Sequence, residues 1–360
     1  LICLTETEPD DQSIVEVKKY CITLEYHKIP KWRSYLSCLL GLFTDKPFQV
    51  LYFSTPLVKS RIKRRIKEIK PDHIFCQLIR MADHVKDYHD CPKTLDYMDA
   101  FSMGVERRIP LAPFYLKWLF KLEADRVKRF ETRMFDYFEF KTIISDQDKN
   151  LIVHPERNKI FRLTNGIDSS FFNYDFQGES DHDLVFVGNL NYPPNVEAVR
   201  FLSRELLPEL YKSAPEIKTL VAGANPSSEV KKCVQSDKNI SLLEGVEDIR
   251  SAYKRGNVFI APMTIGTGLQ NKLLEAMALG IPSISTPLAN NALQAENGKE
   301  IRIAKSKEGL VEAILLSLRS PDTTKIALEG RQFVLENYNW ENSVVNYLKN
   351  IGLYPLKHQA

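Results

Sequence analysis

Short apolar runs alternate with longer amphipathic stretches along most of the 360-residue chain. The apolar runs predict β-strands at 1–5, 22–25, 73–77, 93–97, 141–144, 160–163, 183–187, 218–222, 240–243, 257–261 and 282–285. Helical periodicity occupies most of the intervals between them, as in 193–210, where apolar residues recur every three or four positions. This alternation predicts an α/β protein with parallel sheets that carry helices on both faces.

The length of the chain is too great for one hydrophobic core of ordinary size, so two domains are expected. The segment 165–182 is rich in Gly, Asn, Asp and Ser, and no helical period crosses it. We therefore predict two Rossmann-like domains that face each other across a cleft. The first covers 1–170 and is completed by a C-terminal helix within 340–358, and the second covers 171–339.

Composition and charge narrow the class of protein. Hydrophobic residues make up 44% and charged residues 26%, as in ordinary soluble proteins. Residues 1–165 hold 29 Lys/Arg against 23 Asp/Glu, and the remainder holds 20 against 23. The basic first half suits an anionic membrane or a phosphorylated acceptor, or is simply a solvated surface. Scattered cysteines without zinc spacing and the lack of a long apolar run favour a cytoplasmic protein with reduced thiols.

The sharpest local signal lies at 261–286, where a strand, a glycine-bearing loop and a helix follow one another. Such a junction is an anion site, because glycines let backbone N–H groups approach a phosphate at the helix N-terminus. Lys272 in the first helical turn opposes the helix dipole by about 0.3–1 kcal/mol, and a bound diphosphate would reverse that effect. Glu275, on the same helix face, can accept hydrogen bonds from ribose hydroxyls. The alternative is an ion pair on the surface of a core helix.

Three more glycine loops follow predicted strands. Gly188 and Asn189 come after 183–187, Gly223 ends the next strand, and Val246 follows a glycine after 240–243. In parallel sheets these loops share one edge, so we expect all four on a single rim.

Taken together, these segments resemble glycosyltransferase family 4, whose members have the GT-B fold. The resemblance covers 183–345 through "VFVGNL", "LVAG", "GVEDI", "VFIAP", "GTGLQNKLLEAMALGIPSIST" and a late Trp340–Glu341 helix. "LTNGID" resembles the interdomain segment, and "KTLDYMDAFS" and "TIISDQDKNL" give a weaker match in the first half. The combination is most similar to sugar transferases of bacterial exopolysaccharide production.

This resemblance implies transfer of a sugar from a nucleotide-diphosphate sugar to a glycan or lipid-linked acceptor, with retention of configuration. It implies no metal or other cofactor and no nucleic-acid partner. It assigns Glu275 to the donor ribose, Val246 to the nucleobase and Gly188 to the diphosphate. The remaining donor-binding candidates are Asn189, Gly223, Gly266, Thr267, Gly268, Leu269 and Lys272.

The sequence departs from the family pattern at several positions. Thr267 stands where the family usually has a glutamate, eight residues before Glu275. Asn189 and Pro194 replace an arginine and a lysine that contact the diphosphate. A diphosphate still needs neutralising, so Lys272 is the candidate replacement.

A further departure lies in the first half, where Met98 stands near the place of a family histidine. The candidate catalytic or acceptor-contacting residues of that half are Asp99, with its neighbour Asp96, and Arg80. Alternatively, the two aspartates cap the helix that follows.

The segment 58–70 holds seven Lys/Arg against one Glu around an apolar stripe at helical spacing. It predicts either a sheet-covering helix with a basic outer face or contact with anionic lipid at the inner membrane face. The aromatic and basic stretches 31–43 and 107–121 suit a membrane edge, a lipid-linked acceptor or plain helix packing.

The sequence raises two further expectations, one about its first strand and one about its function. The apolar run at 1–5 corresponds to the second strand of a Rossmann-like domain, so we expect the natural protein to continue upstream by about one βα unit of some 30 residues. Other functions consistent with the sequence are a nucleotide-sugar epimerase of the same fold and a non-catalytic sugar-nucleotide binding module.

Overall fold

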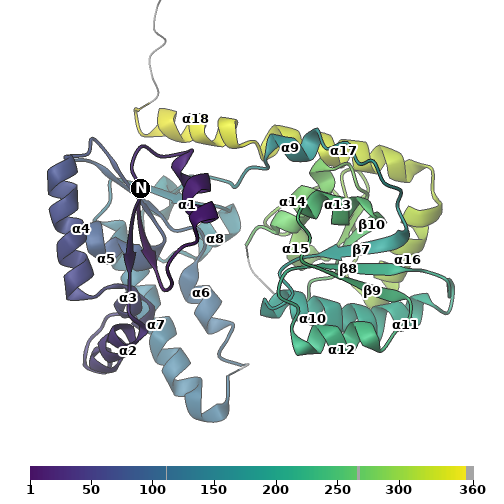
Figure 1. Ribbon diagram of the computed structural model, residues 1–360, viewed down its shortest axis with the longest axis horizontal. Coiled ribbons are helices and arrows are strands. Elements are labelled where there is room, and N and C mark those ends of the chain that lie inside the picture. The colour runs from purple at the N-terminus through teal and green to yellow at the C-terminus, as the bar shows by residue number, and fades with distance from the viewer. Residues whose placement is uncertain (111, 266–267, 354–360) are drawn as a thin grey trace, which may run out of the picture. The chain divides into compact units, whose positions relative to one another are not determined.

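The computed structural model describes residues 1–110, 112–265 and 268–353. Its contacts divide the chain into two compact units, Leu1–Leu163 and Thr164–Ala360 (Figure 1). The division falls at the start of the Gly-, Asn- and Asp-rich segment that marked the boundary in the sequence. Helix α18 (Trp340–Asn350) is counted with the second unit, and its packing against the first unit stays a prediction.

The second unit contains one parallel sheet in the spatial order β12-β11-β10-β7-β8-β9. In chain order the strands are β7 (His182–Val187), β8 (Thr219–Gly223), β9 (Ile240–Glu244), β10 (Gly256–Ala261), β11 (Ser283–Ser285) and β12 (Arg302–Ile303). Counted from β7, this is the doubly wound order 3-2-1-4-5-6 of dinucleotide-binding sheets. The predicted Rossmann-like fold is confirmed here, although β12, a short and only half-buried edge strand, was not predicted.

The central strands of this sheet are buried on both faces because helices cover each side. Every residue of β8 is buried, as are all but one residue of β7 and of β10. The larger covering helices are α10 (Pro193–Phe201), α12 (Ser228–Gln235), α13 (Ile249–Lys254), α14 (Asn271–Ala278), α16 (Lys307–Arg319) and α17 (Asp322–Asn337). Figure 1 shows α10 and α12 side by side on one side of the strands, with α13 and α14 on the other.

The first unit has a four-stranded parallel sheet and a separate parallel pair of strands. The sheet has the order β3-β4-β5-β6, formed by β3 (Ile74–Gln77), β4 (Lys93–Asp96), β5 (Phe140–Ile143) and β6 (Phe161–Arg162). The pair consists of β1 (Ile2–Thr5) and β2 (Glu25–Lys28).

The strand predicted at 22–25 is therefore wrong in position and lies at Glu25–Lys28 instead. Backbone pairing with β1 sets its place, because the N–H of Glu25 donates to Leu1 and that of Ile29 donates to Thr5, both at 2.9 Å. The apolar side chain of Ile22 does not enter the core and is fully exposed.

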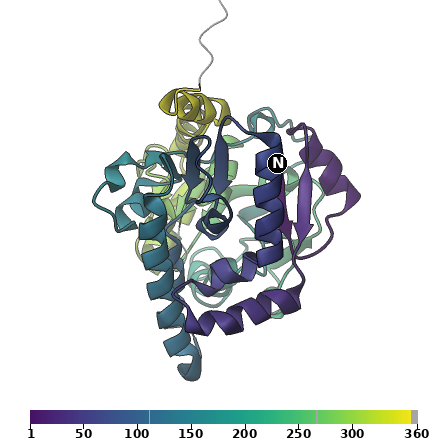
Figure 2. The same ribbon diagram turned by 90° about the vertical axis from the view of Figure 1, so that its left-hand side faces the viewer.

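Helices surround these strands and supply most of the first unit's core. They are α1 (Asp11–Lys18), α2 (Lys31–Leu40), α3 (Phe48–Phe53), α4 (Pro56–Ile69), α5 (Ala82–Val85), α6 (Phe101–Glu106), α7 (Lys117–Phe135) and α8 (Asp146–Leu151). In α4, the predicted apolar stripe is buried at Val58, Ile62 and Ile66, whereas Ile69 stays 49% exposed. Figure 2 looks onto this unit with α4 in front of the space between the β1–β2 pair and β3.

Candidate functional site

Loops after β7, β8, β9 and β10 meet at the carboxyl edge of the second unit's sheet. The strands are parallel, so their carboxyl ends share one edge. The strand order reverses between β7 and β10, which are paired neighbours. Ligands of doubly wound sheets bind beside such a reversal. The fold thus brings Gly188, Gly223, Val246 and the helix that carries Lys272 to one rim, as the sequence predicted.

Two glycines bring the loops after β7 and β8 into contact. The N–H of Gly188 donates to the carbonyl of Ala222 at 3.1 Å. Gly223 has a φ of 151°, and a Cβ there would lie 1.7 Å from the carbonyl oxygen of Gly188. Only glycine fits at this position. A Cβ on Gly188 would in turn meet the side-chain amide of Asn195 at 2.7 Å, so this loop lies directly against the start of α10.

Lys272, in the first turn of α14, reaches across the reversal of the strand order. Its ammonium group donates to the side-chain oxygen of Asn195 and lies 3.6 Å from the sulfur of Met263, just after β10. It also lies 5.0 Å from the ring centre of Phe186 in β7. Burial lowers the pKa of Lys272 to about 8, although Glu275 acts in the opposite direction. This cation is disfavoured by both desolvation and the helix dipole, and an anion bound beside it would relieve both.

Glu275 lies one turn further along α14. The hydroxyl of Tyr253, in α13, donates to Oε2 of this carboxylate at 2.6 Å. Burial raises the pKa of Glu275, while the bond from Tyr253 and the charge of Lys272 act against the rise. Among the residues that the structure describes, Tyr253 is the one hydrogen-bond donor to this carboxylate, which leaves Oε1 able to accept from a ligand hydroxyl.

The loop between β10 and α14 supplies the remaining candidates. Gly268 has a φ of 70°, and a Cβ there would meet nothing within 4 Å, so its backbone borders open space. Leu269 packs against the core of the unit and anchors the loop. The predicted residues Gly266 and Thr267 lie outside the residues that the structure describes.

The loops after β7 and β9 are shaped by their own residues. The side chain of Asn189 accepts a hydrogen bond from the N–H of Asn191 at 3.1 Å, and its carbonyl accepts from Asn195 at 2.9 Å. Asn189 therefore closes its own turn. Val246 packs against the core beside Gly245, whose φ of 67° turns the chain after β9.

Sequence reasoning missed Asn195 and Tyr253, the two residues that hold the charged side chains of α14. Both are buried, and their partners lie 77 and 22 positions away in the chain. A buried asparagine at the start of a helix and a tyrosine on an apolar helix face are common features of α/β proteins. Only the fold shows that these two side chains converge on Lys272 and Glu275.

In the first unit, Arg80 and Asp99 follow the adjacent strands β3 and β4. The guanidinium of Arg80 lies 5.1 and 5.2 Å from the ring centres of Phe53 and Phe101. Burial lowers the pKa of Arg80, and nearby Asp99 acts against that shift. Burial raises the pKa of Asp99 to about 6, with Asp148 adding to the rise and Arg80 opposing it. Arg80 and Asp99 are therefore close enough for the charge of each to shift the pKa of the other.

The backbone just before both residues is strained. Leu78 has a φ of 71° and Met98 one of 65°, although neither is glycine. The amide of Gln77 donates to the sulfur of Met98 at 3.4 Å, which links the two turns. Left-handed backbone costs ordinary residues about 1–3 kcal/mol and concentrates at functional loops. This supports a functional role for the edge formed by the ends of β3 and β4.

The alternative in which Asp96 and Asp99 cap the next helix is wrong. Asp96 is buried and accepts from the hydroxyl of Thr142 at 2.9 Å and from the N–H of Met98 at 3.3 Å, so it shapes the strained turn. Helix α6 begins instead with the N–H of Ser102 donated to the carboxylate of Glu131 at 3.1 Å.

Comparison with known proteins points to one enzyme class for the second unit. Residues 181–320 match a family model described as glycosyl transferases group 1. A 44.6 kDa protein of the cps region of Klebsiella pneumoniae is 26% identical, and the match covers 94% of this chain and 87% of that protein.

Several solved structures share the fold. A glycosyltransferase from Rickettsia africae superposes with a TM-score of 0.68 at 13% identity, covering 99% of this chain and 90% of that one. HepE of Anabaena, solved with UDP and glucose, gives 0.64 at 12% identity and 98% coverage of both chains. Sucrose-phosphate synthase of Thermosynechococcus elongatus gives 0.63 at 15% identity, with 82% and 77% covered. The likeness confirms an α/β fold of two Rossmann-like units.

Neither a metal-binding cluster nor a membrane-spanning helix is found among the described residues. Within 1–110, 112–265 and 268–353, no group of three or more His, Cys, Asp or Glu side chains is placed to hold a metal ion. No helix in those ranges is both long and apolar enough to cross a bilayer.

The lowered pKa of the half-buried Lys272 predicts a distinct pH dependence of stability. A lysine whose folded pKa is near 8, against 10.5 in the unfolded chain, loses its burial penalty as the pH rises between these values. The free energy of unfolding should therefore gain up to about 1.4 kcal/mol per pH unit there. Denaturant titrations from pH 7 to 10.5 should show this gain in the wild type relative to Lys272→Met. The exposed Lys305→Met is the control for loss of a lysine, and equal slopes in wild type and Lys272→Met would contradict the assignment.

Proposed function

We propose that the chain is a glycosyltransferase that takes its sugar from a nucleoside-diphosphate sugar bound at the rim of the second unit. One observation carries this proposal: the half-buried cation of Lys272 lies one helical turn from the carboxylate of Glu275, where the strand order reverses. Both residues fall within the segment that matches the glycosyl transferases group 1 model. A cation and a hydrogen-bond acceptor one helical turn apart suit a diphosphate and a ribose.

Each donor-side residue has a proposed role. Lys272, the N-terminus of α14 and the backbone at Gly188 and Gly268 receive the diphosphate. Glu275 accepts from the ribose hydroxyls, and the backbone at Val246 contacts the nucleobase. The other proposed donor-loop residues are Asn189, Gly223, Gly266, Thr267 and Leu269. UDP is the first nucleotide to try, because HepE was solved with it.

In the proposed reaction the bond between the anomeric carbon and the diphosphate oxygen breaks, and an acceptor hydroxyl oxygen bonds to that carbon. Lys272 stabilises the negative charge that develops on the departing diphosphate. Asp99 takes the proton of the acceptor hydroxyl. The positive charge of Arg80 favours the ionised form of Asp99. The first unit is thus the acceptor side, and configuration is retained, as the family resemblance implies.

We further propose a glycan or lipid-linked acceptor in cell-surface polysaccharide synthesis, with the reaction on the cytoplasmic face and no metal required. The relative from a cps region supports this setting. Transfer from radiolabelled UDP-sugars to a panel of acceptors, with and without EDTA, tests it. Labelled product formed in EDTA is the expected result. An epimerised donor would indicate an epimerase, and binding without turnover a non-catalytic binding module.

Two substitutions should distinguish the proposed ribose-binding residue from the proposed diphosphate-binding residue. Glu275→Ala should weaken binding of both UDP and uridine by about 1.5–3 kcal/mol, the range for hydrogen bonds to charged groups. Lys272→Met should weaken binding of UDP far more than that of uridine. Calorimetric titration of both ligands measures the difference. Equal losses for the two ligands in Lys272→Met, or unchanged affinity in a folded Glu275→Ala, would refute the respective role.

The pKa of Asp99, raised to about 6, predicts the acidic limb of the activity profile. A proton acceptor must be deprotonated, so turnover should rise with pH through about 6 and level off above it. In Asp99→Asn this limb should vanish and turnover should drop by roughly 100-fold or more. Asp146→Asn, at an exposed position near the start of α8, is the control. A variant that keeps the limb at pH 6 would exclude Asp99 as the titrating group.

Membrane contact is proposed through the outer face of α4. Lys59 and Arg65 form ion pairs with Asp83 and Glu25 within the first unit, so they are not available for lipid. The exposed cations of this helix are Arg61, Lys63, Arg64, Lys67 and, at its end, Lys70.

Each such cation near an anionic surface contributes about 1 kcal/mol, screened by salt. Binding to phosphatidylserine vesicles should therefore fall steeply as salt rises and should be lost in Lys63→Glu/Lys67→Glu. The same double charge reversal at Lys232 and Lys238, exposed in the second unit, should leave sedimentation unchanged. No vesicle binding at low salt would rule out this contact.

A further inference from the structure

The side chain of Asn195 joins two separate parts of the candidate site in the second unit. Asn195 lies in the first turn of α10 and is only 5% exposed. Its side-chain oxygen accepts a hydrogen bond from the ammonium group of Lys272, and its side-chain nitrogen donates to the carbonyl of Asn189 at 2.9 Å. One buried amide thus links the turn after β7 to the first turn of α14, 77 positions further along the chain.

This pair of hydrogen bonds selects an asparagine at position 195. An amide carries an acceptor and a donor at the same end of the side chain, and here an ammonium group and a carbonyl oxygen use one each. A carboxylate can accept from Lys272, but it cannot donate to Asn189, so that two oxygens would face each other. An apolar side chain would leave both partners without their bond, which is costly for groups shielded from water.

The turn after β7 is held from two sides. Leu190, which is fully buried, donates its N–H to the carbonyl of Ala224 at 2.8 Å and accepts from the N–H of Ser227 at 3.1 Å, so the loop after β8 fixes one side. Asn195 fixes the other side, and a Cβ on Gly188 would lie only 2.7 Å from its side-chain nitrogen. The ammonium group bonded to Asn195 therefore has a fixed place relative to this turn.

The surroundings of the Lys272 ammonium group leave its charge largely uncompensated. The groups in contact with it are neutral, namely the amide of Asn195, the sulfur of Met263 and the ring of Phe186. The carboxylate of Glu275, on the same helix, acts electrostatically and raises the pKa of Lys272, but its hydrogen bond is to Tyr253 of α13. A carboxylate in place of the Asn195 amide would pair with the cation directly.

We propose that Asn195 is the positioning residue of the diphosphate site. It holds the ammonium group of Lys272 beside the turn at Gly188 and Asn189, and as a neutral partner it leaves the charge of that group for the phosphates. A cation held in place before the ligand arrives loses little side-chain freedom on binding, which favours affinity. This inference rests on the proposed function, because it assigns a role within the nucleoside-diphosphate site.

Two substitutions in the full chain test this role by calorimetric titration. Asn195→Ala removes the bond that holds Lys272, and UDP affinity should fall by roughly tenfold or more, as for loss of a hydrogen bond to a charged group. Asn195→Asp adds a competing anion and should lose still more. Uridine, which has no phosphate, should bind both variants as it binds the wild type, which also shows that they are folded. Asn191→Asp, an added charge at an exposed position of the same turn, should weaken UDP binding far less than Asn195→Asp.

A second measurement follows the charge of Lys272 without any nucleotide. In the wild type the free energy of unfolding should rise between pH 8 and 10.5, because the folded pKa of Lys272 is lowered. Asn195→Ala should keep this rise, since the cation still has no charged partner. In Asn195→Asp the new carboxylate should raise the pKa of Lys272 and abolish the rise. A side chain that only fills space would change stability equally at every pH.

Unchanged UDP affinity in a folded Asn195→Ala, or equal losses for UDP and uridine, would overturn the proposal. A rise in stability with pH in Asn195→Asp as large as that of the wild type would also overturn it. Failure of the proposed function gives a different result, because the wild-type chain would then bind no UDP. If only the role of Asn195 is wrong, the wild type binds UDP and the variants at position 195 bind it equally well.

Discussion

The reversal of strand order between β7 and β10 is the constraint on which the candidate site depends. From β7 the chain forms β8 and β9 on one side of that strand. It then crosses back and forms β10, β11 and β12 on the other side. The loops after β7 and β10 are thereby drawn apart over different faces of the sheet, which opens a place for a ligand between them. Lys272 and Asn195 come from the helices that follow these two strands, so their contact lies at this place.

The energetics of Lys272 support the proposal of an anionic ligand at this position. A lysine at the start of a helix opposes the helix dipole, and here it is also half-buried beside Phe186 and Met263. Its hydrogen-bond partner is the neutral amide of Asn195, whereas the carboxylate of Glu275 acts on it electrostatically. Such a cation raises the free energy of the fold, and the diphosphate proposed above would offset this cost.

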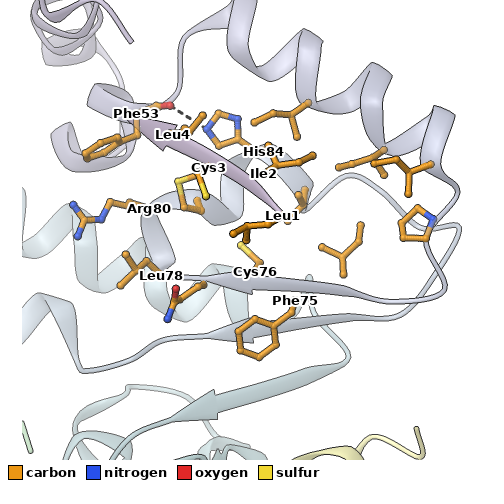
Figure 3. A pocket seen from close by; sticks show the side chains of 18 of the residues that line it. Leu1, Ile2, Cys3, Leu4, Phe53, Phe75, Cys76, Leu78, Arg80 and His84 are labelled. Carbon is orange, nitrogen blue, oxygen red and sulfur yellow. Dashed lines mark hydrogen bonds between the residues drawn. The ribbon is translucent and has the colours of Figure 1, made fainter. Parts of the chain in front are cut away.

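The sheets of the two units are buried to different extents. In the second, the first strand lies between its neighbours and every central strand is buried. In the first unit, a groove of about 700 Å³ lies between β1 and β3 (Figure 3), and α4 and α7 contribute to the core. Leu78, whose backbone has a positive φ, lines this groove together with Arg80.

The sequence by itself predicted the alternation of strands and helices, a domain boundary within 165–182 and the glycine loops at the strand ends. These features are local, because periodicity and turn chemistry act over a few residues. It also placed Lys272 and Glu275 on one helix face, since three residues of separation fix that geometry. The position of β2 escaped it, because pairing with β1 overrides the apolar run at 22–25. The roles of Asn195 and Tyr253, the raised pKa of Asp99 and the groove beside β3 depend on contacts between distant segments, and only the tertiary structure decided them.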